Sequence, residues 1–262
     1  MRTFSHPGYK RFLLSVGCLL SIHFTALFFL TLFRLVFFFS ANYDFPDQEH
    51  VGFMSIWPAF IRGVWFDNVI ACYILLIPLV AVSISALFNY YGKILWNVTC
   101  IFFSLFYGIV LLVTAANIPY FQYFFKIINS SVFNWFGYMN TTAGMVFGET
   151  SYYPPLIGFL LTLVLFIWLM RRLIRHFQRL LNTKNPSVFW LDRIYIFLTA
   201  GICIGLCLFG IRGRTGYNPI KVSAAYYCTD PFLNQLGISP VFNLLSSTLD
   251  DSRKENRYLH LM

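Results

Sequence analysis

The residues of this chain best suited to chemistry are a few charged side chains that flank long apolar runs. Arg62 and Asp67 precede the second run, Lys126 follows the third, and Arg214 and Lys221 follow the last. Arginine and lysine donate charge-assisted hydrogen bonds to phosphate oxygens. We therefore treat these five residues as candidates for a lipid-headgroup site. For Arg62 and Asp67, a structural ion pair between the two is the alternative interpretation.

The sequence contains no pattern typical of a metal site or a disulfide framework. No group of His, Asp and Glu has ligand spacing, so no catalytic residue, metal ligand or cofactor is predicted within these 262 residues. The six cysteines include no CxxC pair, and five lie inside apolar runs, where cysteine behaves as a small hydrophobic residue.

Composition identifies the setting of these side chains as a membrane. The chain is 58% hydrophobic and only 11% charged, whereas soluble domains carry about 25% charged residues. The formal net charge is +9, but about half of the cations fall at one set of predicted helix ends, as positive-inside topology requires. We therefore exclude nucleic acid as a partner and predict an integral membrane protein whose partners are membrane lipids.

Five apolar runs predict five transmembrane helices, since about 20 apolar residues cross the hydrocarbon layer. They are residues 12–39, 69–88, 94–116, 154–170 and 194–211. The first run exceeds the roughly 7–15 apolar residues of a signal peptide, so we interpret it as an uncleaved helix. Arg34, near its outer end, is expected to extend to the headgroups.

The segment between the fourth and fifth runs sets the predicted orientation. Residues 171–193 contain six cations and one acid, Asp192. Short loops rich in Lys and Arg stay in the cytoplasm. This places the N-terminus inside, the C-terminus outside, and residues 212–262 in an extracytoplasmic connector that follows a membrane domain of residues 1–211.

Two outer loops contain segments that we expect to lie at the interface. Residues 51–66 carry Trp57 and Trp65, and indole rings prefer the headgroup region. In residues 117–153, apolar side chains recur at helical spacing, which predicts an amphipathic interfacial helix. Its apolar positions are Phe121, Phe124, Phe125, Ile128 and Val132. The glycosylation patterns at Asn129 and Asn140 are too common to decide anything.

Three further features lie in or after the helices. His23, in the middle of the first run, is either a functional ionisable group or a neutral imidazole bonded to a neighbouring helix, and we favour the second. Gly201 and Gly205 form a GxxxG spacing that predicts close helix packing. In the connector, prolines after Asp230 and Ser239 predict two short helices.

The connector resembles a known family. Residues 214–226 (RTGYNPIKVSAAY), 231–236 (PFLNQL) and 239–247 (SPVFNLLSS) are similar to the juxtamembrane connector of the lipoteichoic acid synthase-like family, which are membrane-anchored members of the sulfatase and alkaline phosphatase superfamily. Residues 62–76 are similar to the start of the second helix there. The layout of five helices, a basic loop and a connector is also shared.

The resemblance implies an enzyme whose catalytic domain is separate from its membrane domain. In that family an extracytoplasmic catalytic domain follows the connector and uses a threonine and a divalent metal, typically manganese, to transfer phosphoglycerol or a related group from a phospholipid. The 262 residues end before such a domain would begin, so we expect a catalytic domain supplied in cis or in trans. The resemblance also implies a bacterial cytoplasmic (inner) membrane.

We therefore expect the membrane domain of a phosphoglycerol transferase or sulfatase-like enzyme, which anchors the catalytic domain and presents a phospholipid. A bare anchor without a headgroup site is one alternative. A transporter or permease subunit is another, although no internal repeat supports it and His23 is the single ionisable group near the membrane centre.

Overall fold

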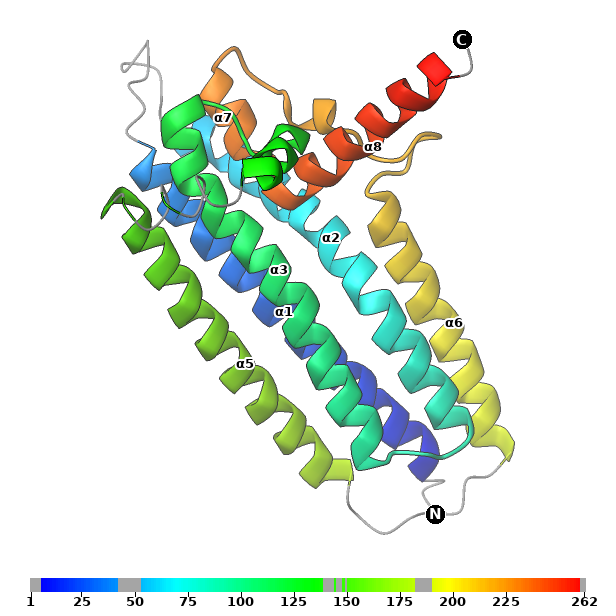
Figure 1. The fold of residues 1–262 in the computed structure, drawn as a ribbon. Coiled ribbons are helices and arrows are strands. Elements are labelled where there is room, and N and C mark those ends of the chain that lie inside the picture. The colour runs from blue at the N-terminus through cyan, green and yellow to red at the C-terminus, as the bar shows by residue number, and fades with distance from the viewer. Residues whose placement is uncertain are drawn as a thin grey trace.

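The protein is a bundle of five long helices with a small helical layer at one end (Figure 1). The computed structural model describes residues 6–41, 53–138, 144, 148, 150–181 and 190–259. The long helices are α1 (Pro7–Ser40), α2 (Phe53–Leu87), α3 (Lys93–Phe124), α5 (Tyr153–Leu181) and α6 (Trp190–Arg212). The end layer holds η1 (Ser130–Tyr138), η3 (Val222–Ala225), α7 (Pro231–Leu236) and α8 (Pro240–Leu259), while η2 (Thr150–Tyr152) leads into α5.

All five long helices are long and apolar enough to cross a membrane, which confirms the number of spans predicted from the sequence. The described residues are otherwise in short helices, turns and bends, with no strand among them. Figure 1 shows the N-terminus at one end of the bundle, and α7 and α8 at the other. We call the first the basic end and the second the connector end.

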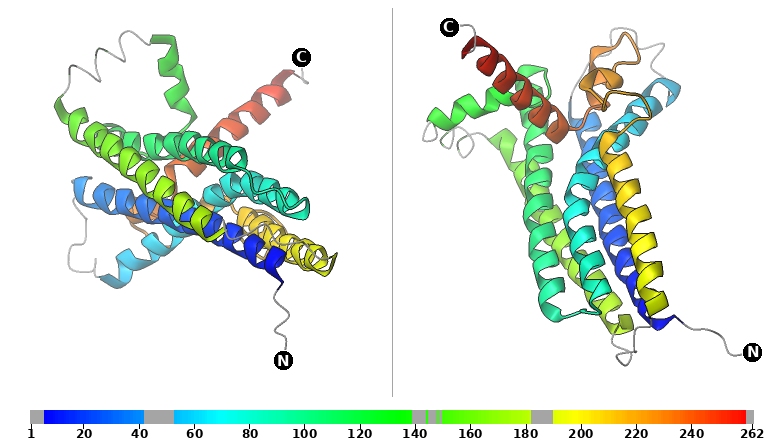
Figure 2. Two further views of the ribbon diagram at one scale, coloured as in Figure 1. Left: turned by 90° about the horizontal axis from the view of Figure 1, so that it is seen from below. Right: turned by 90° about the vertical axis from the view of Figure 1, so that its right-hand side faces the viewer.

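Helices α1 and α2 form the centre of the bundle, and α5 and α6 lie at its periphery. Within the most apolar stretch of each helix, 61% of α2 is buried, compared with 11% of α5 and 17% of α6. Figure 2 shows α5 and α6 on different sides of the bundle. Most of the surface of α5 and α6 therefore lies on the outside of the bundle.

Several serine and threonine hydroxyl groups within the spans are bonded to their own helices. Ser21 donates to the carbonyl of Gly17 at 2.8 Å, and Thr25 donates to that of Ser21 at 2.7 Å. Such bonds to the carbonyl four residues back satisfy a hydroxyl where no water is available. Among Ser21, His23 and Thr25, only the His23 side chain is bonded to another helix.

Helix boundaries depart from the sequence-based expectation at three places. Helix α2 begins at Phe53, so residues 53–66 are its first turns and not a separate interfacial segment. Helix α3 continues to Phe124 through Pro119, and the predicted amphipathic helix is broken at Phe125, whose φ is +53°. The basic segment is helical as far as Leu181 because its apolar face continues the packing of α5.

Among the described residues of this chain, no helix packs against the GxxxG spacing of α6. Gly201 and Gly205 are exposed, and nothing lies within 4 Å of a Cβ built on either. Helix α6 instead approaches α2 at Gly210, where a Cβ would lie 2.6 Å from the Cys72 sulfur. The close approach therefore occurs near the connector end of α6.

The two connector helices begin where the sequence predicts. Asp230 caps α7 by accepting a hydrogen bond from the Leu233 amide at 2.9 Å, and Pro231 is the first helical residue. Helix α8 begins at Pro240 and is longer than expected. Phe232 of α7 packs between Phe37 of α1 and Phe121 of α3, at ring-centre distances of 5.7 and 5.6 Å. The connector thus shares the core of the bundle.

Candidate functional site

Arg34 and Asp67 form a buried ion pair at the connector end. The Arg34 Nη2 donates to Asp67 Oδ2 at 2.6 Å, and both side chains are at most 5% exposed. Arg34 Nη1 donates to the carbonyls of Leu236 and Ile238. One guanidinium therefore joins α1, α2 and the α7–α8 junction. The prediction that Arg34 extends to the headgroups is wrong, because its side chain is buried.

Arg62 has different partners from the one proposed from sequence. Its guanidinium lies 4.4 Å from the centre of the Tyr227 ring, and its Nε donates to the Ala224 carbonyl at 3.2 Å. On a helix, residues five apart point about 140° away from each other. Because residues 53–67 are helical, Arg62 and Asp67 lie on different faces of α2, which is why the Arg62–Asp67 pair does not form.

Tyr227 connects the start of α2 to the connector. Its hydroxyl donates to the Ser55 carbonyl at 2.6 Å. Burial raises the pKa of this hydroxyl above its ordinary value, with smaller contributions in the same direction from Cys228 and Asp230 and an opposing one from Arg62. The neutral hydroxyl is therefore the stable form, and it can keep donating.

The turn after α3 is also bonded to the connector. The Ile127 amide donates to Gln235 Oε1 at 3.1 Å, and Asn243 Nδ2 donates to the Ile128 carbonyl at 2.9 Å. Ser130 Oγ donates to Asp251 of α8 at 2.6 Å. Residues 213–251 are thus held against the ends of α1, α2 and α3 and do not form a free linker.

The five candidate headgroup residues do not form one cluster. Asp67 is buried against Arg34, and Arg62 is partly covered by Tyr227. Lys126, Arg214 and Lys221 are exposed. Only these three have cationic groups that a headgroup can approach freely.

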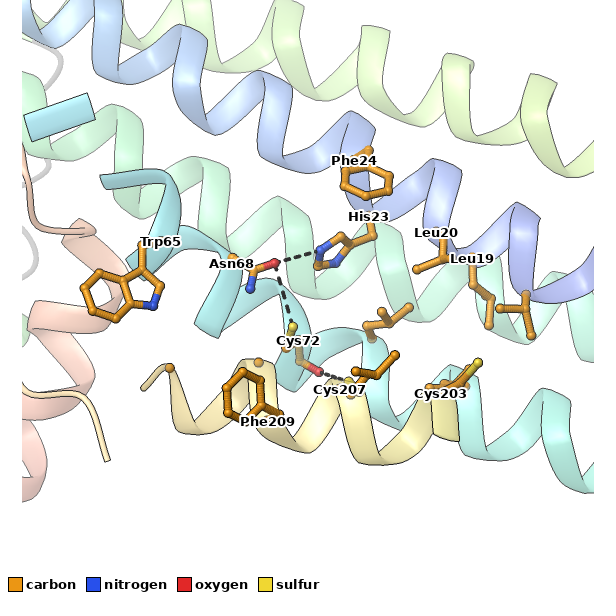
Figure 3. A pocket seen from close by; sticks show the side chains of 16 residues that line it. Leu19, Leu20, His23, Phe24, Trp65, Asn68, Cys72, Cys203, Cys207 and Phe209 are labelled. Atoms are coloured by element: carbon orange, nitrogen blue, oxygen red, sulfur yellow. Dashed lines mark hydrogen bonds between the residues drawn. The ribbon is translucent and has the colours of Figure 1, made fainter. Parts of the chain in front are cut away.

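A cavity of about 390 Å³ lies between α1, α2 and α6 (Figure 3). Its lining is mostly apolar, and it includes Phe24 and Leu206, which are 63% and 65% exposed on the outside of the bundle. The cavity therefore opens sideways, towards the lipid, between α1 and α6. It was not predicted from the sequence, because no local pattern shows which helix faces leave a gap.

A short polar row crosses this cavity. In Figure 3, Asn68 and Cys72 of α2 lie between His23 of α1 and Cys207 of α6. His23 Nε2 lies 3.0 Å from Asn68 Oδ1, and the Cys207 thiol donates to the Cys72 carbonyl at 3.2 Å. The hydrogen bond from His23 to a neighbouring helix, which the favoured interpretation requires, is confirmed. No group of three metal-binding side chains occurs among the described residues.

The connector end of the cavity adjoins a turn whose sequence carries three cations. Gly213 lines the cavity with φ +71°, and a Cβ on it would lie 2.7 Å from Ile220. The Ile220 amide also donates to the Arg212 carbonyl at 3.0 Å. This tight turn places Arg212, Arg214 and Lys221 next to residues that border the cavity.

Comparison with protein-family models, curated proteins and solved structures found no match to this chain.

Proposed function

We propose that this chain is the membrane domain of a phosphoglycerol transferase or sulfatase-like enzyme, and that it presents a phospholipid to an extracytoplasmic catalytic domain. The enzyme class rests on the connector resemblance. The observation that carries lipid presentation is the cavity between α1, α2 and α6, which is bordered by exposed residues of α1 and α6 and by Gly213, in the turn that carries Arg212, Arg214 and Lys221.

A phospholipid fits both parts of this arrangement. A mostly apolar cavity of this size falls within the range of ligand pockets, about 300–1,000 Å³, and in a bilayer acyl chains are the groups available to fill it. The phosphate would then lie at the connector end, where Arg214 and Lys221 are exposed. Charge-assisted hydrogen bonds from these cations would hold it there.

The bonding of the connector supports an anchoring role. Arg34, Arg62 and Tyr227 fix the connector to the bundle, so a domain attached through it would keep a defined position over the membrane. In this proposal the basic end lies in the cytoplasm of a bacterial cell and the connector end outside. The concentration of cations in residues 171–193 supports that orientation. A divalent metal such as manganese would belong to the catalytic domain.

A transporter or permease subunit is the second candidate, and the polar row around His23 is the observation in its favour. The residues on the basic side of the cavity weigh against an open channel. Phe12, Val82 and Ile196 are completely buried there, so apolar packing closes the cavity towards the basic end. An alternating-access transporter opens one end at a time, so a measurement of solute uptake is what decides that alternative.

Lipid photocrosslinking tests the proposal. The full chain is reconstituted with phosphatidylglycerol carrying a diazirine on one acyl chain, and cross-linked peptides are mapped. We expect cross-links near Phe24 and Leu206, and we expect Leu206→Trp to reduce them by partly filling the cavity. Leu161→Trp, at an equally lipid-exposed position of α5 away from the cavity, is the matched control and should not reduce them.

Cross-links spread evenly over all lipid-facing helices would refute a defined lipid site and leave the bare anchor. The enzyme class is tested separately, by measuring phosphoglycerol transfer from a fluorescent phospholipid in membranes that contain the complete gene product. Replacing Arg214 and Lys221 by Gln should lower that transfer. Uptake of a solute without any transfer would favour the transporter.

A further inference from the structure

Three of the four arginines of α5 lie on one exposed stripe of that helix. Trp168, Arg172, Arg175 and Arg179 border a surface hollow of about 390 Å³. The same stripe runs towards the connector end through the exposed residues Ile157, Leu161 and Val164. At 3.6 residues per turn, these seven positions fall within about 80° of the helix circumference. The arginines therefore point in the direction in which α5 contacts the bilayer.

The opposite face of α5 is packed against the bundle. Met170, Ile174 and Leu181 are buried. At its end, the Leu181 carbonyl accepts hydrogen bonds from the Arg11 guanidinium, the shorter being 2.9 Å. Packing and these bonds fix the rotation of α5 about its axis. Arg172, Arg175 and Arg179 therefore keep a fixed outward orientation.

The depth of the arginines matches the headgroup layer. Residues 153–170 of α5 span about 27 Å, close to the hydrocarbon thickness of about 30 Å. Arg172 and Arg175 follow Met170 by roughly 3 and 8 Å along the axis, and the headgroup layer of one leaflet is about 5–8 Å thick. Trp168 lies at the boundary, with the Arg172 guanidinium 5.3 Å from its ring, which suits the preference of indole for that depth.

No carboxylate is near enough in sequence to neutralise these arginines. Residues 150–191 contain no Asp or Glu. Asp192 is fully buried, and its Oδ1 lies 2.8 Å from His6 Nδ1. Arg175 Nε donates to the Arg171 carbonyl of its own helix, which adds no negative charge. Among the residues that the structure describes, no carboxylate pairs with Arg172 or Arg175, so the hollow has a strong positive charge at the depth of lipid phosphates.

We propose that Arg172 and Arg175, with Trp168 beside them, bind the headgroup of an anionic phospholipid at the basic end of α5. This site is separate from the cavity between α1, α2 and α6 and does not depend on the function proposed above. Its ligand is a lipid in the bilayer, because the arginines face the bilayer laterally and lie within its headgroup layer.

Trp168 provides a local reporter for this site. The full chain is reconstituted in phosphatidylcholine bilayers that contain a minority of phosphatidylglycerol, with bromine on the acyl chains of one lipid at a time. The quenching at Trp168 is obtained as the difference in quenched tryptophan fluorescence between the unmodified chain and Trp168→Phe. We expect brominated phosphatidylglycerol to quench several-fold more, per molecule, than brominated phosphatidylcholine.

Two double variants separate a site from a general charge effect. Arg172→Gln with Arg175→Gln should lower the preference for phosphatidylglycerol by a factor of roughly five per arginine, the usual effect of a cation at an anionic surface. Lys93→Gln with Arg193→Gln removes two exposed cations from other helices at the same end and should leave the preference at Trp168 intact.

Equal quenching by the two brominated lipids, or an equal loss of preference in both double variants, would overturn the proposal. Displacement of the quenching lipid by millimolar inorganic phosphate would overturn it too, because the site would then recognise free phosphate and not a membrane lipid. If this headgroup site is refuted, the cross-links expected near Phe24 and Leu206 are still predicted, because they report on the separate cavity between α1, α2 and α6.

Discussion

Replacing Asp67 by Asn removes the negative charge that faces Arg34 and keeps the shape of the side chain. Breaking a buried ion pair by removing one partner costs about 3–5 kcal/mol, because the remaining charge has lost its compensation. Arg34 would still donate to the carbonyls of Leu236 and Ile238, so we expect a cost near the lower limit. About 3 kcal/mol corresponds to a shift of roughly a hundredfold in an equilibrium constant.

The assay follows the undocking of the connector from the bundle. Cys228 is partly buried beside Asn234 in the connector, so its rate of maleimide labelling reports how often that region opens. We expect Asp67→Asn to raise the rate by up to about a hundredfold and to lower the thermal midpoint of the protein in detergent. A cycle with Arg34→Met and the double variant measures the coupling energy between the two residues.

The matched control is the exposed ion pair of α8. Lys254 and Asp251 are 3.6 Å apart and largely exposed, and such pairs contribute at most about 1 kcal/mol. Lys254→Ala should leave Cys228 labelling almost unchanged. If Asp67→Asn behaves like Lys254→Ala, or if the cycle gives no coupling, the ion pair does not fix the connector and the reasoning fails.

Two further predictions concern the same junction. Gly63→Ala should lower the thermal midpoint by several degrees, because its methyl group would overlap the Arg34 guanidinium. Gly158→Ala is the control and should leave the midpoint unchanged, because no atom lies within 4 Å of its methyl group. Equal midpoints for the two variants would contradict the packing of Arg34 on α2. Tyr227→Phe removes the bond to the Ser55 carbonyl and should cost about 1 kcal/mol. Since the folded-state pKa of Tyr227 is raised above 10.0, its contribution is complete below about pH 10 and is lost as the pH rises further. The rate of maleimide labelling at Cys228, measured from pH 8 to 11, should therefore rise more at the alkaline end in the unmodified chain than in Tyr227→Phe. Parallel pH curves for the two proteins would contradict a role of this hydroxyl in holding the connector.

Apolar length was enough to predict the five spans, and local capping chemistry was enough to predict the starts of α7 and α8. Both depend on residues that are neighbours in the sequence. The predicted boundaries of α2 and α3 were wrong, because each helix extends beyond the apolar run that predicted it: α2 begins at Phe53 and contains Pro58, and α3 continues through Pro119 to Phe124. The cost of one lost backbone bond is smaller than the gain from continued packing, as the burial of Phe121 shows.

The headgroup candidates show where sequence reasoning loses accuracy. Arg62 and Asp67 are close in sequence, but the partner of Asp67 is Arg34, on another helix. A buried charge needs a partner of opposite sign. Arg34 and Asp67 are isolated charges near the same end of neighbouring apolar runs, and this placement could have predicted their pairing. The helical phase of α2 would have excluded the pair with Arg62. The cavity depends on how α1, α2 and α6 are rotated against one another, and the sequence does not encode that locally.

The lipid-presenting role is tested most directly by a cryo-electron microscopy map of the full chain in nanodiscs containing phosphatidylglycerol. We predict acyl-chain density in the cavity bordered by Phe24, Asn68 and Leu206, continuous with phosphate density beside Arg214 or Lys221. An empty cavity with ordered lipid only elsewhere on the bundle would contradict the account and leave a membrane anchor without a lipid site.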